Sequence, residues 1–205
     1  MASTATIGKG AATREAIIDR AYAMACSSGL EGLSIGTLAQ AVGMSKSGVF
    51  AHFGSREDLQ LAVLDSAADR FLAYVFTPAM KAPRGLARLA TMVDDWFDWS
   101  RHTNGGCLLL AAVSEYDDRP GPLRDRVVKQ QADWRKQIAH AVQLAIDTGE
   151  VDPACEPQQM SFEIYSLALG VHHDAGLSGH PQALARGQRA YRRLIDSYRT
   201  TRNNT

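Results

Sequence analysis

Two short helices separated by a single glycine turn constrain this chain more than any other feature of its sequence. Ser34 precedes one apolar stretch with helical spacing and Ser45 precedes the next, and serine is among the residues preferred at a helix N-cap. Gly43 stands between them, where it supplies the stop of the first helix and lets the backbone reverse. The pattern predicts helices at about 35–42 and 46–53, and two such helices in succession form a helix-turn-helix signature.

The second helix of this pair has the dimensions and the surface of a DNA-recognition element. Eight residues in a helix span about 12 Å, which matches the width of the major groove of B-DNA. The apolar residues expected to hold the two helices together are Leu38, Val42, Val49 and Phe53. The outward side carries Lys46, Ser47, Gly48, Ala51 and His52. Small residues there let the backbone approach DNA closely, while Lys46 and Ser47 can reach base edges or phosphates.

The residues of this region are closer to one known family than a general helix-turn-helix pattern requires. The segment from Leu33 to Asp65 reads LSIGTLAQAVGMSKSGVFAHFGSREDLQLAVLD and resembles the DNA-binding domain of the TetR family of bacterial repressors. The resemblance covers about residues 13–65. It implies an all-α fold, in which an N-terminal three-helix DNA-binding domain is joined to a larger C-terminal helical domain for ligand binding and dimerisation. We expect these domains at 1–56 and 57–205.

Carried over residue by residue, the resemblance implies DNA contacts from both helices of the pair and from the start of the next helix. Ser34 and Thr37 correspond to polar positions that touch phosphate, and Ser45 corresponds to the cap of the recognition helix. Contact residues follow directly after this cap, and a histidine near the end of the helix often touches the DNA backbone. The residues expected to contact DNA are Ser34, Thr37, Ser45, Lys46, Ser47, Gly48, Phe50, His52 and Arg56.

Two of these positions depart from the family pattern. Phe50 stands where the family usually has a tyrosine whose hydroxyl donates to a phosphate, so this contact is either absent or supplied by another group. A place in the core is an open alternative for Phe50. Arg56 stands where the family usually has a lysine, and the substitution keeps the positive charge.

The formal net charge of the chain is zero, but the charges are divided unevenly along it. Residues 1–56 carry 5 Lys/Arg against 3 Asp/Glu, residues 57–180 carry 11 against 18, and residues 181–205 carry 6 against 1. An acidic middle segment repels a polyanion, so a nucleic acid is expected to bind near a terminus. We interpret the basic tail from Arg186 to Arg202 as a solvated helix face.

The remaining segments also have helical spacing, and no stretch alternates apolar and polar residues as a half-buried strand does. An N-terminal helix is expected from Arg14 to Ser28, with Thr13 as its cap. A fourth helix begins at Arg56, after a capping box that starts at Ser55, and Pro78 is expected beyond its end. Further helices are predicted at about 84–102, 106–117, 121–149, 157–177 and 181–200.

Large aromatic residues in the second half of the chain suit the small-molecule effector that the resemblance implies. Such residues line ligand cavities, but they also fill cores. Cys107 is a candidate sensor thiol, with a buried and inert thiol as the alternative. Adjacent histidines at 172 and 173 point about 100° apart on a helix, so we expect no metal and no cofactor. The candidate ligand-binding residues are Phe76, Met92, Trp96, Trp99, Cys107, Trp134 and His172.

The resemblance further implies a homodimer on a double-stranded, palindromic DNA operator, because one short helix reads too few base pairs to select a site. The interface is expected at the last two helices, with the candidates Ala168, Gly170, Leu167, Val171 and Leu194. A DNA-binding protein without an effector is the main alternative. An all-helical enzyme is a further one, although the sequence carries no phosphate loop, nucleophile elbow or paired-carboxylate motif and no catalytic residue is expected.

Location follows from features that the sequence lacks. The longest unbroken apolar run, residues 107–113, is far shorter than the roughly 20 residues of a membrane-spanning helix, and the first residues do not read as a secretory signal. Three cysteines without metal-like spacing do not suggest a disulfide framework. We therefore expect a soluble cytoplasmic protein with no membrane partner.

Overall fold

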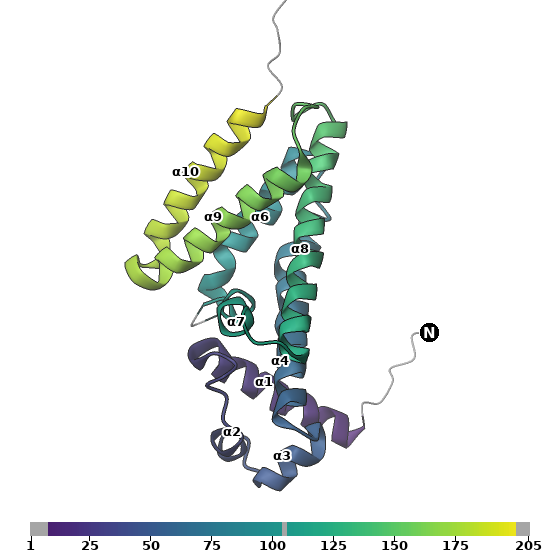
Figure 1. Ribbon diagram of the computed structural model, residues 1–205, viewed down its shortest axis with the longest axis vertical. Helices are drawn as coiled ribbons and strands as arrows, with labels where there is room; N and C mark the ends of the chain where they lie inside the picture. Colours follow the sequence, from purple (N-terminus) through teal and green to yellow (C-terminus); the bar gives the residue numbers. More distant parts are fainter. Residues whose placement is uncertain (1–7, 104–105, 200–205) are drawn as a thin grey trace, which may run out of the picture.

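The computed structural model describes residues 8–103 and 106–199, and its regular elements in these ranges are all helical (Figure 1). An isolated antiparallel bridge joins Val151 to Arg199. The all-α prediction is confirmed. Among the described residues, no helix combines the length and the apolar character needed to cross a bilayer. The first seven residues of the predicted DNA-binding domain, and the basic tail from residue 200 onward, lie outside the described residues.

The first helix, α1 (Lys9–Ser28), begins five residues before its predicted start, so the assignment of Thr13 as its cap is wrong. Gly8 is the N-cap and offers no side-chain hydrogen bond. The alanines that precede Thr13 favour the helix strongly enough to extend it without a capping side chain. The inward face of α1 is as predicted, with Ile17, Ala21 and Ala25 buried.

The helix pair forms as the cap signals indicate, with α2 at Ile35–Ala41 and α3 at Lys46–Phe53. Ser45 caps α3, since its hydroxyl accepts a hydrogen bond from the Gly48 backbone N–H at 3.1 Å. Ser34 occupies the N-cap position of α2 but makes no side-chain capping bond. Gly43, between the helices, has a φ of +67°, a conformation that favours glycine over residues with a Cβ atom.

The fourth helix, α4 (Arg56–Phe71), continues through a π-helical segment, η1 (Leu72–Phe76), into the short α5 (Thr77–Ala79). Pro78 therefore lies within α5, the last segment of this continuous helix, and the prediction that it lies beyond the end of the helix is wrong. The change of register in η1 puts Pro78 into the first turn of α5, where a missing N–H costs nothing. π-helical turns inside α-helices are frequent at functional sites.

The helical body follows along the chain. It consists of α6 (Leu86–His102), α7 (Leu108–Tyr116), α8 (Pro122–Asp147), α9 (Pro157–Ser178) and α10 (His180–Tyr198). Each helix lies within a few residues of a predicted one. In Figure 1, α8 runs along the length of the molecule near α4, α1–α3 gather at one end, and α9 and α10 lie side by side toward the other.

The pairing of α9 with α10 corrects part of the predicted dimer interface. Ala168 and Val171 are buried within the protomer, because α9 turns them toward its own core. Leu167 and Leu194 are half-buried against the same core, and Gly170 is exposed. Helical spacing alone did not distinguish the inner face of α9 from its outer face.

Two hydrophobic cores meet along α4. The first contains the apolar residues of α1–α3 with Leu59, Val63 and Ala67 of α4, and it extends to residues of α7 and α8. The second fills the helical body and contains Phe71 and, from η1, Val75. The predicted boundary at residue 56 falls just before this shared helix, and it stays a prediction.

Close packing of α10 on α9 gives the first testable prediction. A Cβ atom on Gly187 would lie 2.2 Å from Val171 Cγ2, whereas one on Gly10 of α1 would meet no atom within 4 Å. Gly187→Ala is therefore expected to lower the free energy of unfolding by about 1–3 kcal/mol through overpacking. Gly10→Ala, the matched control, is expected to leave it unchanged or slightly raised. Urea unfolding of both variants checks this, and equal effects would contradict the packing.

Candidate nucleic-acid interface and ligand cavity

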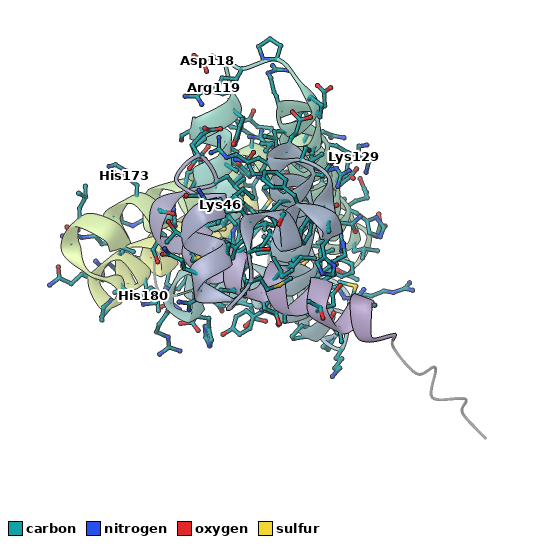
Figure 2. The ribbon with its side chains drawn as sticks, turned by 90° about the horizontal axis from the view of Figure 1, so that it is seen from below. Lys46, Asp118, Arg119, Lys129, His173 and His180 are labelled. Atoms are coloured by element: carbon teal, nitrogen blue, oxygen red, sulfur yellow. The ribbon has the colours of Figure 1, made fainter. Side chains whose placement is uncertain are left out.

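The outward surface of α3 lies at the end of the molecule formed by α1–α3, with Lys46 near the middle of that end (Figure 2). Lys46, Ser47 and Ala51 are exposed, while Gly48 and His52 are half-buried. The hydroxyls of Ser45 and Ser47 are 3.0 Å apart and share a hydrogen bond. The start of α3 therefore forms an accessible face, with a lysine beside two hydroxyls.

A glycine of α2 supports this face. A Cβ atom on Gly36 would lie 3.1 Å from Lys46 Cε, so the absence of a side chain lets the lysine stem cross α2. Sequence reasoning did not assign a role to Gly36. The signal was present, because glycine inside a short helix costs stability relative to alanine and needs a reason. Ser34 and Thr37, the predicted phosphate contacts of α2, are both exposed.

The two positions that depart from the family pattern have different surroundings. Phe50 is 39% exposed, so it lies on the surface of the protomer and not in its core. Arg56 is turned toward the loop that precedes α2: its Nη2 donates to the Glu31 carbonyl at 2.6 Å and its Nε to the Leu33 carbonyl at 3.3 Å. In this structure the Arg56 guanidinium thus positions that loop.

A polar cluster joins the DNA-binding end to the helical body, and we name it the Glu31 junction. It consists of Glu31, Arg56, Gln60, Glu115, Tyr116 and Arg119. The Tyr116 hydroxyl donates to Glu31 Oε1 at 2.7 Å, and Glu115 Oε2 accepts from the Glu31 backbone N–H at 3.0 Å. Buried Gln60 donates to the Leu30 carbonyl at 2.8 Å. These hydrogen bonds connect the loop between α1 and α2 to both α4 and α7.

The charges of the junction are balanced around Glu31. The hydrogen bond from Tyr116 holds the pKa of the Glu31 carboxyl below its usual value, and the guanidinium groups of Arg56 and Arg119 act in the same direction. Burial and the Glu31 carboxylate both raise the pKa of Tyr116, so its hydroxyl stays protonated and donates. Glu31 is therefore ionised at neutral pH. Its carboxylate accepts the hydrogen bond from Tyr116 of the body and forms ion pairs with Arg56 and Arg119.

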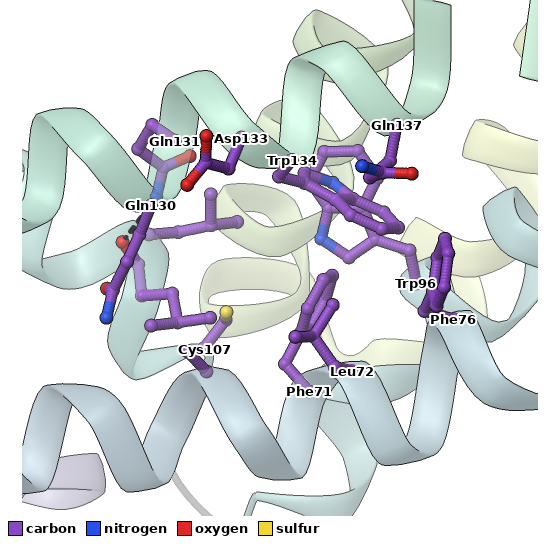
Figure 3. A pocket seen from close by; sticks show the side chains of 13 residues that line it. Phe71, Leu72, Phe76, Trp96, Cys107, Gln130, Gln131, Asp133, Trp134 and Gln137 are labelled. Atoms are coloured by element: carbon purple, nitrogen blue, oxygen red, sulfur yellow. Dashed lines mark hydrogen bonds between the residues drawn. The ribbon is translucent and has the colours of Figure 1, made fainter. Parts of the chain in front are cut away.

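A cavity of about 290 Å³ lies between α4 and α8 (Figure 3). Side chains from α4 and η1 line one wall and those from α8 the opposite wall, with residues of α6 and the start of α7 completing it. The lining residues are Ala68, Phe71, Leu72, Phe76, Trp96, Cys107, Leu109, Leu110, Gln130, Gln131, Asp133, Trp134 and Gln137. Four aromatic rings and a row of polar groups on one helix thus face a common space.

Four of the seven candidate ligand-binding residues line this cavity: Phe76, Trp96, Cys107 and Trp134. The other three do not, since Met92 is fully buried in the core, Trp99 packs on Phe71 and Tyr74, and His172 borders a separate surface groove. The glutamines of α8 were missed. Their signal was the spacing of Gln130, Trp134 and Gln137 at i, i+4 and i+7, which places them on one face of a helix.

Neither Cys107 nor His172 has the surroundings of a reactive group. Burial raises the pKa of the Cys107 thiol to about 11, so it stays protonated at neutral pH. Burial also lowers the pKa of His172, whose Nδ1 accepts from the Cys107 backbone N–H at 3.3 Å. Across the described residues, no group of three or more His, Cys, Asp or Glu side chains is arranged to hold a metal ion.

Comparison with known proteins places both ends of the chain in one family. Residues 17–63 match the model described as "Bacterial regulatory proteins, tetR family", and residues 85–191 match "Tetracyclin repressor-like, C-terminal domain". The HTH-type transcriptional repressor ComR of Escherichia coli K12 is 24% identical over 162 residues, which cover 77% of each chain.

Solved structures have the same fold. A TetR transcriptional regulator from Chloroflexus aurantiacus is 27% identical, with a TM-score of 0.79 over 94% of this chain and 99% of that one. A TetR-family regulator from Cytophaga hutchinsonii is 20% identical, with a TM-score of 0.83 over 97% and 100% of the two chains.

Lys46 provides a direct test of the candidate interface. Lys46→Ala is expected to weaken binding to every DNA sequence and to reduce the slope of log K against log salt concentration by about 0.9, because one phosphate contact is lost. Lys81→Ala removes an exposed lysine in the turn after α5 and serves as the control. Salt titrations on DNA fragments that the purified protein retains measure both slopes. An unchanged slope for a folded Lys46→Ala protein would mean that α3 is not the recognition helix.

Tyr116 provides a test of the Glu31 junction. Tyr116→Phe removes the hydroxyl that donates to Glu31, so the variant is expected to be less stable than the wild type at pH 7. A carboxyl whose pKa is lower in the folded state than in the unfolded state stabilises the fold at every pH above its unfolded-state pKa. This stabilisation is lost as the pH falls through the folded-state pKa. The difference between the two proteins should therefore shrink below about pH 4.

The matched control for Tyr116→Phe is Tyr191→Phe, which deletes a buried hydroxyl that has no hydrogen-bond partner among the described residues. This variant is expected to lose no stability, because no bond is broken. Unfolding free energies of the three proteins between pH 3 and pH 7 provide the measurement. A Tyr116→Phe variant as stable as the wild type at pH 7 would contradict the junction.

Proposed function

The chain belongs to the TetR family of bacterial transcriptional regulators, and we propose that it is a repressor that a small-molecule effector releases from a palindromic operator. The observation that carries the proposal is the 290 Å³ cavity in the helical body, which is connected to the DNA-binding end by two helices. A partly polar cavity of this size favours a ligand-responsive regulator over a DNA-binding protein without an effector. The similarity to a protein named as a repressor supports the direction of control.

The first connection is α4. Arg56, its first residue, contacts the loop before α2, whereas Ala68 and Phe71 in its later turns line the cavity. From Arg56 to the end of η1 the helix spans about 30 Å, so a small displacement near the cavity becomes a larger one at the recognition helix. A ligand that shifts the population from 1:99 to 99:1 must prefer the released state by about 5.5 kcal/mol.

The second connection is α7. Leu109 and Leu110 at its start line the cavity, while Glu115 and Tyr116 at its end bind the Glu31 loop. Because a single short helix touches both places, a ligand that moves α7 also acts on the loop that precedes α2. In this proposal the Glu31 junction carries the effector's signal to the DNA-binding unit.

The enzyme alternative has less support from the cavity. An enzyme needs titratable groups that converge on a reacting atom. Among the described lining residues, the ionisable side chains are Asp133 and the buried Cys107 thiol. Asp133 already pairs with two lysines, and the thiol stays protonated.

Dimerisation is proposed to occur through the outer face of α9. Phe162, Leu169 and Leu177 are 54%, 39% and 75% exposed, and their spacing of seven and eight residues places them on one stripe of the helix. Exposed apolar stripes of this kind mark protein–protein contacts. A two-fold axis across this face would pair two recognition helices on successive turns of the same DNA.

The experiment that tests the proposed function begins with DNA fragments retained by the purified protein. Sequencing them is expected to yield a palindrome whose half-sites are one helical turn, or a multiple of it, apart. Leu169→Glu is expected to convert a dimer into a monomer at micromolar concentration and to weaken binding to this palindrome at least tenfold. Val128→Glu, at an exposed apolar site of α8, is the charge-matched control and should remain dimeric.

Light scattering of the three proteins without DNA measures their assembly state. A wild-type protein that is monomeric at micromolar concentration, or retained fragments without two-fold symmetry, would overturn the proposed mode of binding.

A further inference from the structure

We propose that the cavity binds an uncharged, largely apolar small molecule with one hydrogen-bonding group, which Gln137 recognises, and that it excludes anions. This inference rests on the proposed effector function, since it names the chemical class of the effector.

The walls suit a compact and flat apolar molecule. At about 290 Å³ the cavity lies at the small end of the range for ligand pockets. Phe71, Trp96 and Trp134 meet edge to face, with ring centroids 4.8–6.1 Å apart, so each ring holds the next in place. A rigid aromatic wall favours a ligand that fills it by shape.

The charges that face the cavity are already paired. Asp133 is the charged residue among the described lining residues, and its carboxylate pairs with the ammonium groups of Lys129 and Lys136 on the same helix. The hydrogen bond from Lys129 holds the pKa of the Asp133 carboxyl below its usual value, so this carboxylate is ionised and already has cationic partners. Behind the wall, Asp65 pairs with Arg126.

A charged ligand therefore gains no partner in the cavity. None of the described lining residues is a lysine, an arginine or a histidine, so an anion would lose its hydration without a compensating cation. A cation would have to compete with two lysines for Asp133. An uncharged molecule avoids both costs.

Some polar side chains of α8 already make hydrogen bonds within the protein, and another is free to bind a ligand. Gln131 donates to the Leu109 carbonyl at 3.1 Å and accepts from the Tyr165 hydroxyl at 2.9 Å. Gln130 donates to Asp65 at 3.2 Å. Gln137 makes no hydrogen bond to any described residue, so its carboxamide is free to donate and to accept.

The available polar group lies at one end of the cavity. Figure 3 shows Gln137 beside the Trp134 ring, at the end toward Phe76, while Gln130, Gln131 and Asp133 gather at the other end. The indole N–H of Trp134 is buried and has no hydrogen-bond partner in the described part of the chain. Trp134 and Gln137 are three residues apart on α8 and both line the cavity, so an unfilled donor and an unfilled carboxamide share one helix face, which makes this end the point of polar recognition.

The test of charge uses two fluorescent probes that share one skeleton. N-phenyl-1-naphthylamine is uncharged, and 8-anilino-1-naphthalenesulfonate adds a single sulfonate. The uncharged probe is expected to bind at least tenfold more tightly to the full-length protein. Failure of the uncharged probe to bind, equal binding of the sulfonate, or tighter binding of a trimethyl(2-naphthyl)ammonium competitor would overturn the inference.

The location of the bound probe is tested by filling the cavity. Ala68→Phe adds a ring to the lining and is expected to reduce binding of the uncharged probe at least tenfold without removing a core side chain. Ala87→Phe adds the same ring at an exposed site of α6 outside the lining, and is expected to bind the probe as the wild type does. Equal binding by both variants would place the probe elsewhere and overturn the assignment.

The role of Gln137 is tested with two competitors of the same shape, 2-acetylnaphthalene and 2-isopropenylnaphthalene, which exchange a carbonyl oxygen for a methylene group. The wild type is expected to bind the ketone about two- to tenfold more tightly than the alkene, because one neutral hydrogen bond contributes an affinity difference of this size. Gln137→Leu should lower this preference, because the Trp134 indole N–H alone then remains to donate to the ketone, while Gln143→Leu, at an exposed site of the same helix, should keep it in full. A preference that Gln137→Leu leaves unchanged would overturn the role of Gln137.

These measurements separate the ligand class from the proposed function. Probe binding is measured without DNA, so it judges the chemistry of the cavity alone. Release of the retained DNA fragments by the uncharged probe then judges the regulatory role. A probe that binds as expected and leaves DNA affinity unchanged would uphold the ligand class and contradict effector-induced release.

Discussion

The burial of one helix in two hydrophobic cores is the constraint on which the rest of this structure depends. The inward stripe of α4 begins with Leu59 and Val63 in the DNA-binding core and ends with Phe71 in the core of the body. Neither core is complete without its part of α4. The orientation of the DNA-binding unit is therefore coupled to the packing of the body, and a cavity beside α4 lies where packing can change that orientation.

The cavity exists because aromatic rings fill the body incompletely. Trp96 and Trp134 belong to the core and to the cavity lining at once, since their rings pack against Phe71 and also border the open space. A ligand bound there would replace missing packing contacts beside both α4 and α7. The Glu31 junction adds a polar link of short hydrogen bonds, which depend more strongly on direction than apolar contacts do.

Local signals predicted most of the fold. Ser45 with Gly48, and Gly43 with its positive φ, act within a few residues, so the helix pair could be located without tertiary information. The start of α1 was misplaced because a cap is a preference that strong helix formers can override. The π-helical segment before Pro78 had no local sequence signal, and it contributes Phe76 to the cavity that Phe71 of α4 also lines.

The sequence by itself determined that this protein is all-helical, where the helix pair lies and which residues the second helix of the pair presents at the surface. Periodicity, caps and glycines are properties of neighbouring residues, and they do not depend on distant parts of the chain. Only the tertiary structure decided which aromatic residues border a cavity, that Arg56 and Tyr116 meet at Glu31, and that Gln137 makes no hydrogen bond to another described residue. Those facts depend on contacts between helices far apart in the chain, which no local pattern encodes.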